Sequence, residues 1–134
     1  MILKRYGFTR VGKWMINRGI RSGISFQIDS LKNERVIYSF VINKETKYIG
    51  ICENRKTHLI ARMNRYKSMQ GSGTNEHIAK RIKKALQEKK TVEIYALNPQ
   101  PSKHYKGLNV DLVKGLENPL IAKIRPKWNR ANTQ

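Results

Sequence analysis

The chain of 134 residues carries 28 Lys and Arg against 9 Asp and Glu, so its formal net charge is +19 and its pI about 10.4. This length fits one domain with a short extension, no apolar run approaches the ~18 residues of a membrane helix, and we expect no secretory signal. Because self-repulsion of this size opposes folding, the charge predicts a polyanionic partner. The lack of a membrane-length apolar run, of a visible secretory signal and of paired cysteines predicts no membrane and a cytoplasmic location, in the bacterial cytoplasm or nucleoid. With Cys52 as the single cysteine, an internal disulfide and a cysteine-based zinc site are excluded.

Residues 1–35 are predicted to form a basic N-terminal arm or hairpin that precedes the main domain. Residues 1–28 contain six basic side chains and no acidic one, and their glycines disfavour a long helix. Apolar and polar residues alternate over 25–29, which is typical of one short strand. The segment either lies along DNA or is a solvated extension. On the first interpretation its candidate DNA contacts are Lys4, Arg5, Arg10 and Lys13.

The main domain, residues 36–134, begins with two β-rich apolar runs. These runs, 36–42 and 47–52, flank the turn residues 43–46 and predict an antiparallel hairpin. Alternation over 92–96 predicts a third strand. We therefore expect a small three-stranded antiparallel sheet.

Three helices are expected around this sheet, which makes the fold class α+β. The first carries Leu59, Met63 and Tyr66 at i, i+4 and i+7. The second, after residue 73, has one apolar face and one basic face, and the basic face either is solvated or contacts phosphates through Lys80 and Lys84. Residues 98–104 are predicted to form a loop, because two prolines keep them out of a helix.

The last predicted helix contains the acidic residue that differs most from ordinary surface charge. Glu117 opens a short apolar helix with Pro119 in its first turn, so its carboxylate either balances the helix dipole or binds a metal. The acidic residues are too few for two metal ions, so one Mg²⁺ on one glutamate, with waters and phosphate oxygens, is the expected arrangement. The three histidines show no metal-binding spacing.

The hairpin and the helix after it resemble the signature of the GIY-YIG nuclease superfamily. Residues 36–38 read Val-Ile-Tyr and residues 48–50 read Tyr-Ile-Gly, similar to the paired tripeptides that name the family. Leu59 and Arg62 match its Leu-x-x-Arg pattern. The leading glycine of the first tripeptide is replaced by Val36, a change that a strand tolerates well.

Two further blocks extend the resemblance toward the C-terminus. Glu117 stands where the family keeps its metal-binding glutamate, and residues 126–129 resemble the Pro-x-Trp-Asn segment of its phage and restriction members. The blocks occur in the family's order and cover residues 36–129. Overall size and the Leu-Glu-x-Pro-Leu segment are most similar to the branch of phage endonuclease II and the small GIY-YIG restriction endonucleases.

The resemblance implies a metal-dependent DNA endonuclease that acts on double-stranded DNA. Tyr38 would take the proton from the attacking water, Arg62 would hold the scissile phosphate, and Glu117 would bind Mg²⁺, with Mn²⁺ as a substitute. Because one site cuts one strand, the resemblance also implies a homodimer or homotetramer, in a bacterium or a phage-infected host cell. The candidate catalytic residues are Tyr38, Tyr48, Arg62, Tyr66, Glu117 and Asn129.

Several alternatives stay open at this point. Tyr66 stands where many members have a histidine, but it also fits an apolar core stripe with Leu59 and Met63. Tyr38 and Tyr48 on their own are also typical of half-buried sheet aromatics. A non-enzymatic basic nucleic-acid-binding protein is the main alternative function, and a repair-type nickase within a larger complex is another. A requirement for Mg²⁺ separates the first of these from a nuclease.

Overall fold

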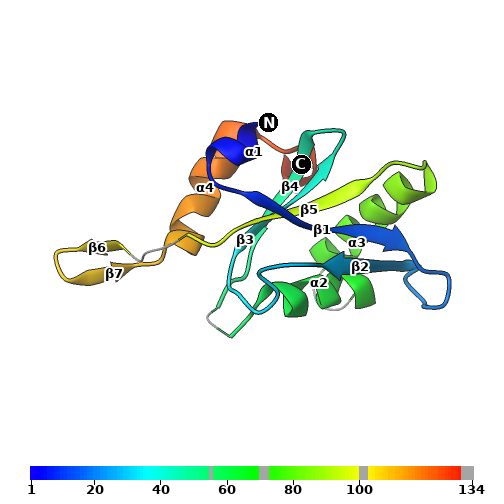
Figure 1. Cartoon of the computed structure of the whole chain (residues 1–134), viewed down its shortest axis with the longest axis horizontal. Helices are drawn as coiled ribbons and strands as arrows, with labels where there is room; N and C mark the ends of the chain where they lie inside the picture. The colour runs from blue at the N-terminus through cyan, green and yellow to red at the C-terminus, as the bar shows by residue number, and fades with distance from the viewer. Residues whose placement is uncertain (55, 70–72, 100–102, 131–134) are drawn as a thin grey trace.

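A five-stranded antiparallel sheet between two layers of helices forms the domain (Figure 1). The computed structural model describes residues 1–54, 56–69, 73–99 and 103–130. The strands stand in the order β2-β1-β5-β3-β4, so β3, β4 and β5 are direct neighbours at one side of the sheet. The strands are β1 (Thr9–Ile16), β2 (Ile24–Ile28), β3 (Ile37–Ile42), β4 (Glu45–Ile51) and β5 (Val92–Leu97).

The prediction of three strands is wrong, because residues 1–35 contribute β1 and β2 to the same sheet. β1 pairs with β2 on one side and with β5 on the other. The register of β1 against β5 shifts between Arg10 and Gly12, and Val11 and Gly12 are both buried. Such a bulge breaks the alternation that marks a strand in a sequence. The glycine and the basic residues then made β1 resemble an irregular arm.

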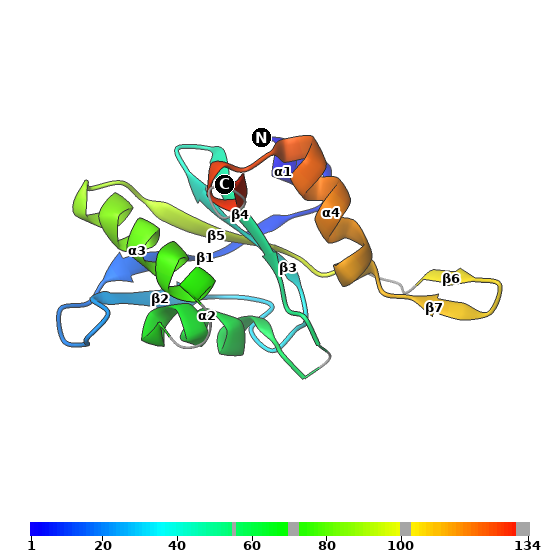
Figure 2. The ribbon, with the colours of Figure 1, turned by 180° about the vertical axis from the view of Figure 1, so that it is seen from behind.

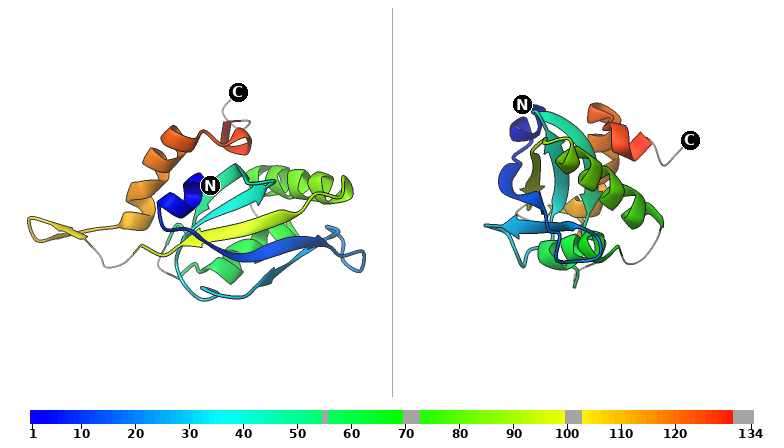
Figure 3. Two further views of the ribbon diagram at one scale, coloured as in Figure 1. Left: turned by 45° about the horizontal axis from the view of Figure 1, so that its top comes forward. Right: turned by 90° about the vertical axis from the view of Figure 1, so that its right-hand side faces the viewer.

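Helices cover both faces of the sheet (Figures 2 and 3). On one face lie α2 (Leu59–Ser68) and α3 (Gly73–Gln87). On the other lie α1 (Ile2–Arg5) and α4 (Leu112–Ile124), which share a core with Ile37 and Val41 of β3. All six residues of β3 are buried, as expected for a strand covered on both faces.

The start of α4 differs from the prediction. Asp111 caps the helix, and its side chain accepts from the backbone N–H groups of Val113 and Lys114. Pro119 lies inside the helix and not in its first turn. Proline lacks the N–H that an interior position would donate, which made the segment before it look like a helix start. Glu117 therefore lies in the body of α4, where the interpretation as balancing charge for the helix dipole no longer holds.

A second, two-stranded sheet projects from the domain between β5 and α4 (Figure 1). Of the loop predicted over 98–104, residues 100–102 lie outside the described residues, and the last two belong to the first strand of this sheet. The sheet consists of β6 (Lys103–Tyr105) and β7 (Leu108–Val110), and Tyr105 and Leu108 on it are exposed. The short helix α5 (Lys127–Arg130) ends the described chain beside β4. Within the described ranges, no helix has the length and apolar character needed to cross a bilayer.

Candidate active site

Three tyrosines from separate elements meet under α2. Tyr38 on β3 and Tyr48 on β4 point to the same face of the sheet, with ring centroids 6.4 Å apart, as their strand positions predicted. Tyr66 on α2 reaches the same cluster, and its hydroxyl lies 2.7 Å from that of Tyr38, a hydrogen bond in which either oxygen can donate. From the sequence, Tyr66 could be either a core residue or a catalytic one. In the structure it is fully buried and is also hydrogen-bonded to Tyr38.

Gly50 makes the position of the Tyr38 ring possible. The two residues face each other across the β3–β4 pair. A Cβ atom placed on Gly50 would lie 2.5 Å from the Tyr38 hydroxyl oxygen and 2.6 Å from its Cζ. Any other residue would force the ring to move, so a glycine is needed here for close approach.

Arg62 projects from α2 into the tyrosine cluster. Its guanidinium carbon lies 4.6 Å from the centroid of the Tyr66 ring and 6.0 Å from that of Tyr38. Its Nη1 donates to the Asn75 side-chain oxygen at 3.1 Å. Its Nε is buried and has no hydrogen-bond partner among the described residues. A buried donor without a partner costs about 1–3 kcal/mol, which an anionic oxygen entering beside it would recover.

Burial controls the protonation of the tyrosines. It raises the pKa of Tyr38 well above its ordinary value, and Tyr48 raises it further, while Arg62 and the hydrogen bond from Tyr66 lower it. Burial also raises the pKa of Tyr66 well above the ordinary value and raises that of Tyr48. The neutral phenols are therefore favoured in the resting protein, and a cationic group beside the cluster favours the phenolate.

Glu117 approaches this cluster from α4. Burial raises the pKa of Glu117, and the nearby Glu53 raises it further. Among the residues that the structure describes, Glu117 forms no salt bridge. Burial is the main cause of the raised pKa of Tyr48, and the negative charge of Glu117 adds to it. Glu53 and Glu117 are near enough to act on each other electrostatically, and carboxylates supply the hard oxygen donors that suit Mg²⁺.

The carboxylates could supply only some of the ligands of one metal ion, and water or substrate oxygens would have to supply the rest. No group of three or more His, Cys, Asp or Glu side chains within the described residues could hold a metal. Mg²⁺ is commonly bound by one or two carboxylates with waters and phosphate oxygens, so this donor set is compatible with it. Glu53 was not a candidate from the sequence, because its proximity to Glu117 arises only when α4 packs on β4.

Asn129 forms hydrogen bonds to the backbone of β4. Its Oδ1 accepts from the N–H of Ile49 and its Nδ2 donates to the carbonyl of Ile49, both at 2.8 Å. The amide thus replaces one residue of a missing neighbour strand at the sheet edge, directly after Tyr48. Asn129 is a positioning residue in this arrangement. Trp128 beside it is buried in the core.

Two further residues that the sequence did not single out hold these elements together. Asn75 at the start of α3 accepts from Arg62. Arg35 donates to the carbonyls of Cys52 and Glu53 and also to the Asp111 carboxylate at 2.8 Å. Arg35 therefore ties the start of α4 to the end of β4. Neither residue belongs to a recognisable motif, because both act between elements distant in the sequence.

The structure does not gather the predicted DNA contacts on one surface. They are Lys4, Arg5, Arg10, Lys13, Lys80 and Lys84. The two on α1 and the two on α3 lie on opposite faces of the sheet. Arg10 forms a salt bridge with Glu93 at 2.7 Å, and Lys80 forms one with Glu76 at 3.2 Å. Their role in DNA binding stays a prediction.

The fold is that of known DNA-cutting enzymes, although no family model and no curated protein matches the sequence. A mutant of bacteriophage T4 EndoII is similar to it with a TM-score of 0.70 and 24% identity, over 95% of this chain and 95% of that chain. The restriction endonuclease HPY188I in complex with product DNA is similar with a TM-score of 0.55 and 22% identity, over 91% of this chain and 76% of that chain. At these identities the likeness shows the fold, and at that level it confirms the resemblance to phage endonuclease II and to small restriction endonucleases.

Proposed function

We propose that this protein is a Mg²⁺-dependent endonuclease of the GIY-YIG type that hydrolyses phosphodiester bonds of double-stranded DNA. The observation that supports it most directly is Arg62, whose buried Nε lacks a partner beside three clustered tyrosines. A phosphate oxygen is a suitable acceptor, because arginine binds phosphate through charge-assisted hydrogen bonds. Glu117 lies close enough to influence Tyr48, so one site would combine a proton acceptor, an anion clamp and a carboxylate.

In this mechanism Tyr38 accepts the proton of the attacking water as a phenolate. The Tyr66 hydroxyl donates to the phenolate oxygen, and the positive charge of Arg62 further stabilises the phenolate against the cost of burial. Arg62 also holds the phosphate and stabilises the negative charge that grows in the transition state. Glu117 would hold Mg²⁺ with waters and phosphate oxygens, and the ion when bound supplies charge stabilisation at the leaving oxygen.

A supercoiled plasmid tests this proposal. We expect the wild-type protein to nick or linearise it with Mg²⁺ or Mn²⁺ and to leave it intact in EDTA. Glu117→Gln should lose cleavage and still shift the plasmid on a gel, because it removes an acid from a basic protein. Glu88→Gln, at an exposed position directly after the end of α3, is the matched control and should cut normally.

Two results would contradict the proposal. Cleavage by Glu117→Gln at the wild-type rate would remove the metal assignment. An intact plasmid that nonetheless shifts on the gel with every divalent ion would favour the alternative, a non-enzymatic basic nucleic-acid-binding protein, for which the net charge of +19 alone is sufficient.

A further inference from the structure

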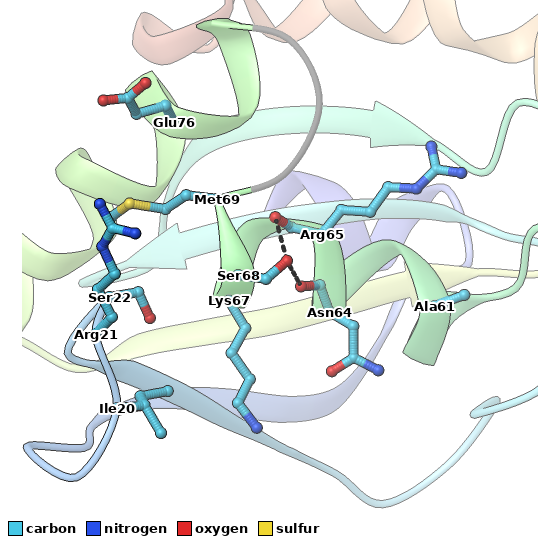
Figure 4. A pocket seen from close by; sticks show the side chains of 10 residues that line it. All are labelled: Ile20, Arg21, Ser22, Ala61, Asn64, Arg65, Lys67, Ser68, Met69 and Glu76. Atoms are coloured by element: carbon cyan, nitrogen blue, oxygen red, sulfur yellow. Dashed lines mark hydrogen bonds between the residues drawn. The ribbon is translucent and has the colours of Figure 1, made fainter.

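A hollow lies between α2 and the loop that joins β1 to β2, on the side of α2 away from the tyrosines (Figure 4). Its volume is about 940 Å³. Arg21 stands on the loop wall, and Arg65 and Lys67 stand on the α2 wall. Asn64 and Ser68 add polar groups to the α2 wall.

A second hollow of about 570 Å³ continues from the first along α3. Ile20 and Arg21 line both hollows, so the loop tip forms the ridge between them. The second hollow adds Arg18, Lys83 and Lys89. The Lys83 side chain lies over the loop, since a Cβ atom on Gly23 would stand only 3.1 Å from its Cε.

The charge of the two hollows is strongly one-sided. Six cationic side chains line them: Arg18, Arg21, Arg65, Lys67, Lys83 and Lys89. Within the described part of the chain none of the six forms a salt bridge. Glu76 is the one acidic residue among the described lining residues, and Lys80 already pairs with it at 3.2 Å. Lys67 lies over the ring of Phe26, and none of the six has an acidic partner among the described residues. Like charges that line one surface without acidic partners repel one another unless an anion binds there.

We infer that these two hollows form one phosphate track that binds the backbone of duplex DNA beside the cleavage site. The inference rests on the proposed function, because it assigns the DNA substrate a path across the protein. None of the six side chains belongs to the catalytic cluster. Arg18 and Arg21 belong to the basic segment 1–28, and Lys83 and Lys89 to the basic helix face, that the sequence already offered for phosphate contacts. The track adds Arg65 and Lys67 and joins the two regions into one surface.

The dimensions agree with a run of phosphates. The α3 residues that line the hollows run from Glu76 to Gln87, eleven steps along the helix, which at a rise of ~1.5 Å per residue is about 16 Å. One DNA strand carries a phosphate about every 3.4 Å along the helix axis, so this length matches roughly five phosphates. The six cationic side chains and the one acidic side chain that line the hollows leave a net positive charge similar in size to the negative charge of these phosphates.

The helix α2 connects the track to the cleavage site. Arg62 and Tyr66 face the tyrosine cluster, while Ala61, Asn64 and Arg65 face the hollow.

The test is the salt dependence of DNA binding, measured by fluorescence anisotropy with a labelled duplex of about 30 base pairs in EDTA, over about 50 to 200 mM KCl. The track variant is Arg21→Gln, Lys67→Gln and Lys83→Gln in the full chain. Each lost phosphate contact reduces the slope of log K against log salt by ~0.9, so we expect the slope to fall by about 3 and the affinity at low salt to fall about tenfold or more.

The control removes the same charge from the other parts of the surface: Lys44→Gln, Lys114→Gln and Lys123→Gln, all exposed. We expect it to change the slope by less than about 1. Equal slopes for track and control variants would overturn the inference. If the track variant does not unfold cooperatively in circular dichroism, Arg21→Gln alone replaces it, with an expected slope change of about 1.

The outcome separates the inference from the proposed function. A wild-type protein that cuts plasmid with Mg²⁺ while the track variant keeps the wild-type slope would refute the track and leave the nuclease intact. A wild-type protein that neither binds nor cuts duplex DNA would refute both. A reduced slope in the track variant, with wild-type affinity in the control, would support the track whether or not cleavage is seen.

Discussion

The contact between Gly50 and Tyr38 allows a sharp test of how the catalytic cluster is built. Gly50→Ala would place a methyl group 2.5 Å from the Tyr38 hydroxyl oxygen and 2.6 Å from Cζ. Both distances are too short, and the ring is fully buried, so it can yield only by disturbing its neighbours. Overpacking of this kind costs ~1–3 kcal/mol. Loss of the hydrogen bond to Tyr66 adds about 1 kcal/mol.

We therefore expect Gly50→Ala to lower the free energy of unfolding by about 2–4 kcal/mol in urea titration and to reduce plasmid cleavage at least as strongly as Tyr38→Phe. The control is Gly115→Ala on α4, where a Cβ atom meets nothing within 4 Å. That change should stabilise the protein by about 0.5–1 kcal/mol, because alanine is the better helix former.

Combining Gly50→Ala with Tyr38→Phe should not restore stability, because removing the hydroxyl leaves Cζ in place 2.6 Å from the new methyl group. Wild-type stability and cleavage in Gly50→Ala would refute the reasoning. So would an equal loss of stability in Gly115→Ala, since the effect would then be general to glycine positions.

Three further predictions concern the strand edge, the proton acceptor and the start of α4. Asn129→Ala leaves the N–H and carbonyl of Ile49 without their partner and should cost about 1–3 kcal/mol in urea titration; an unchanged midpoint would contradict the positioning role. Because the pKa of Tyr38 is raised, its phenolate fraction grows as pH rises, so the single-turnover cleavage rate should increase about tenfold per pH unit from about pH 6 to 8, and a flat profile would exclude this acceptor. Asp111→Ala should lower the free energy of unfolding by about 1 kcal/mol, because the helix cap is lost. The hydrogen bond from Arg35 lowers the pKa of Asp111 below 3.8, so the stabilisation by its carboxylate is present above that pH and is lost as pH falls through the lowered value. Acid titration of both proteins can follow this loss.

The candidate site contains residues of a sequence motif and residues that hold the motif in place. Only the first kind could be identified from the sequence. Tyr38 and Tyr48 share a sheet face because strand residues alternate, and Arg62 and Tyr66 share a helix side because they are four residues apart. These relations depend only on the local geometry of strands and helices, so they follow from the spacing of the residues along the chain. Asn75 and Arg35 act between elements that meet only in the folded chain.

The sequence by itself determined the α+β class, the β3–β4 hairpin, helix α2 and the tyrosine and arginine positions, because periodicity and turn chemistry act over a few residues. Tertiary structure alone decided that β1 and β2 complete the sheet, since a bulge hides the alternation of β1. It also decided that Glu53 lies beside Glu117 and that Asn129 binds the edge of β4. The phosphate track depends on it most, because its six cations come from a loop, two helices and the turn after α3, which no spacing along the chain connects.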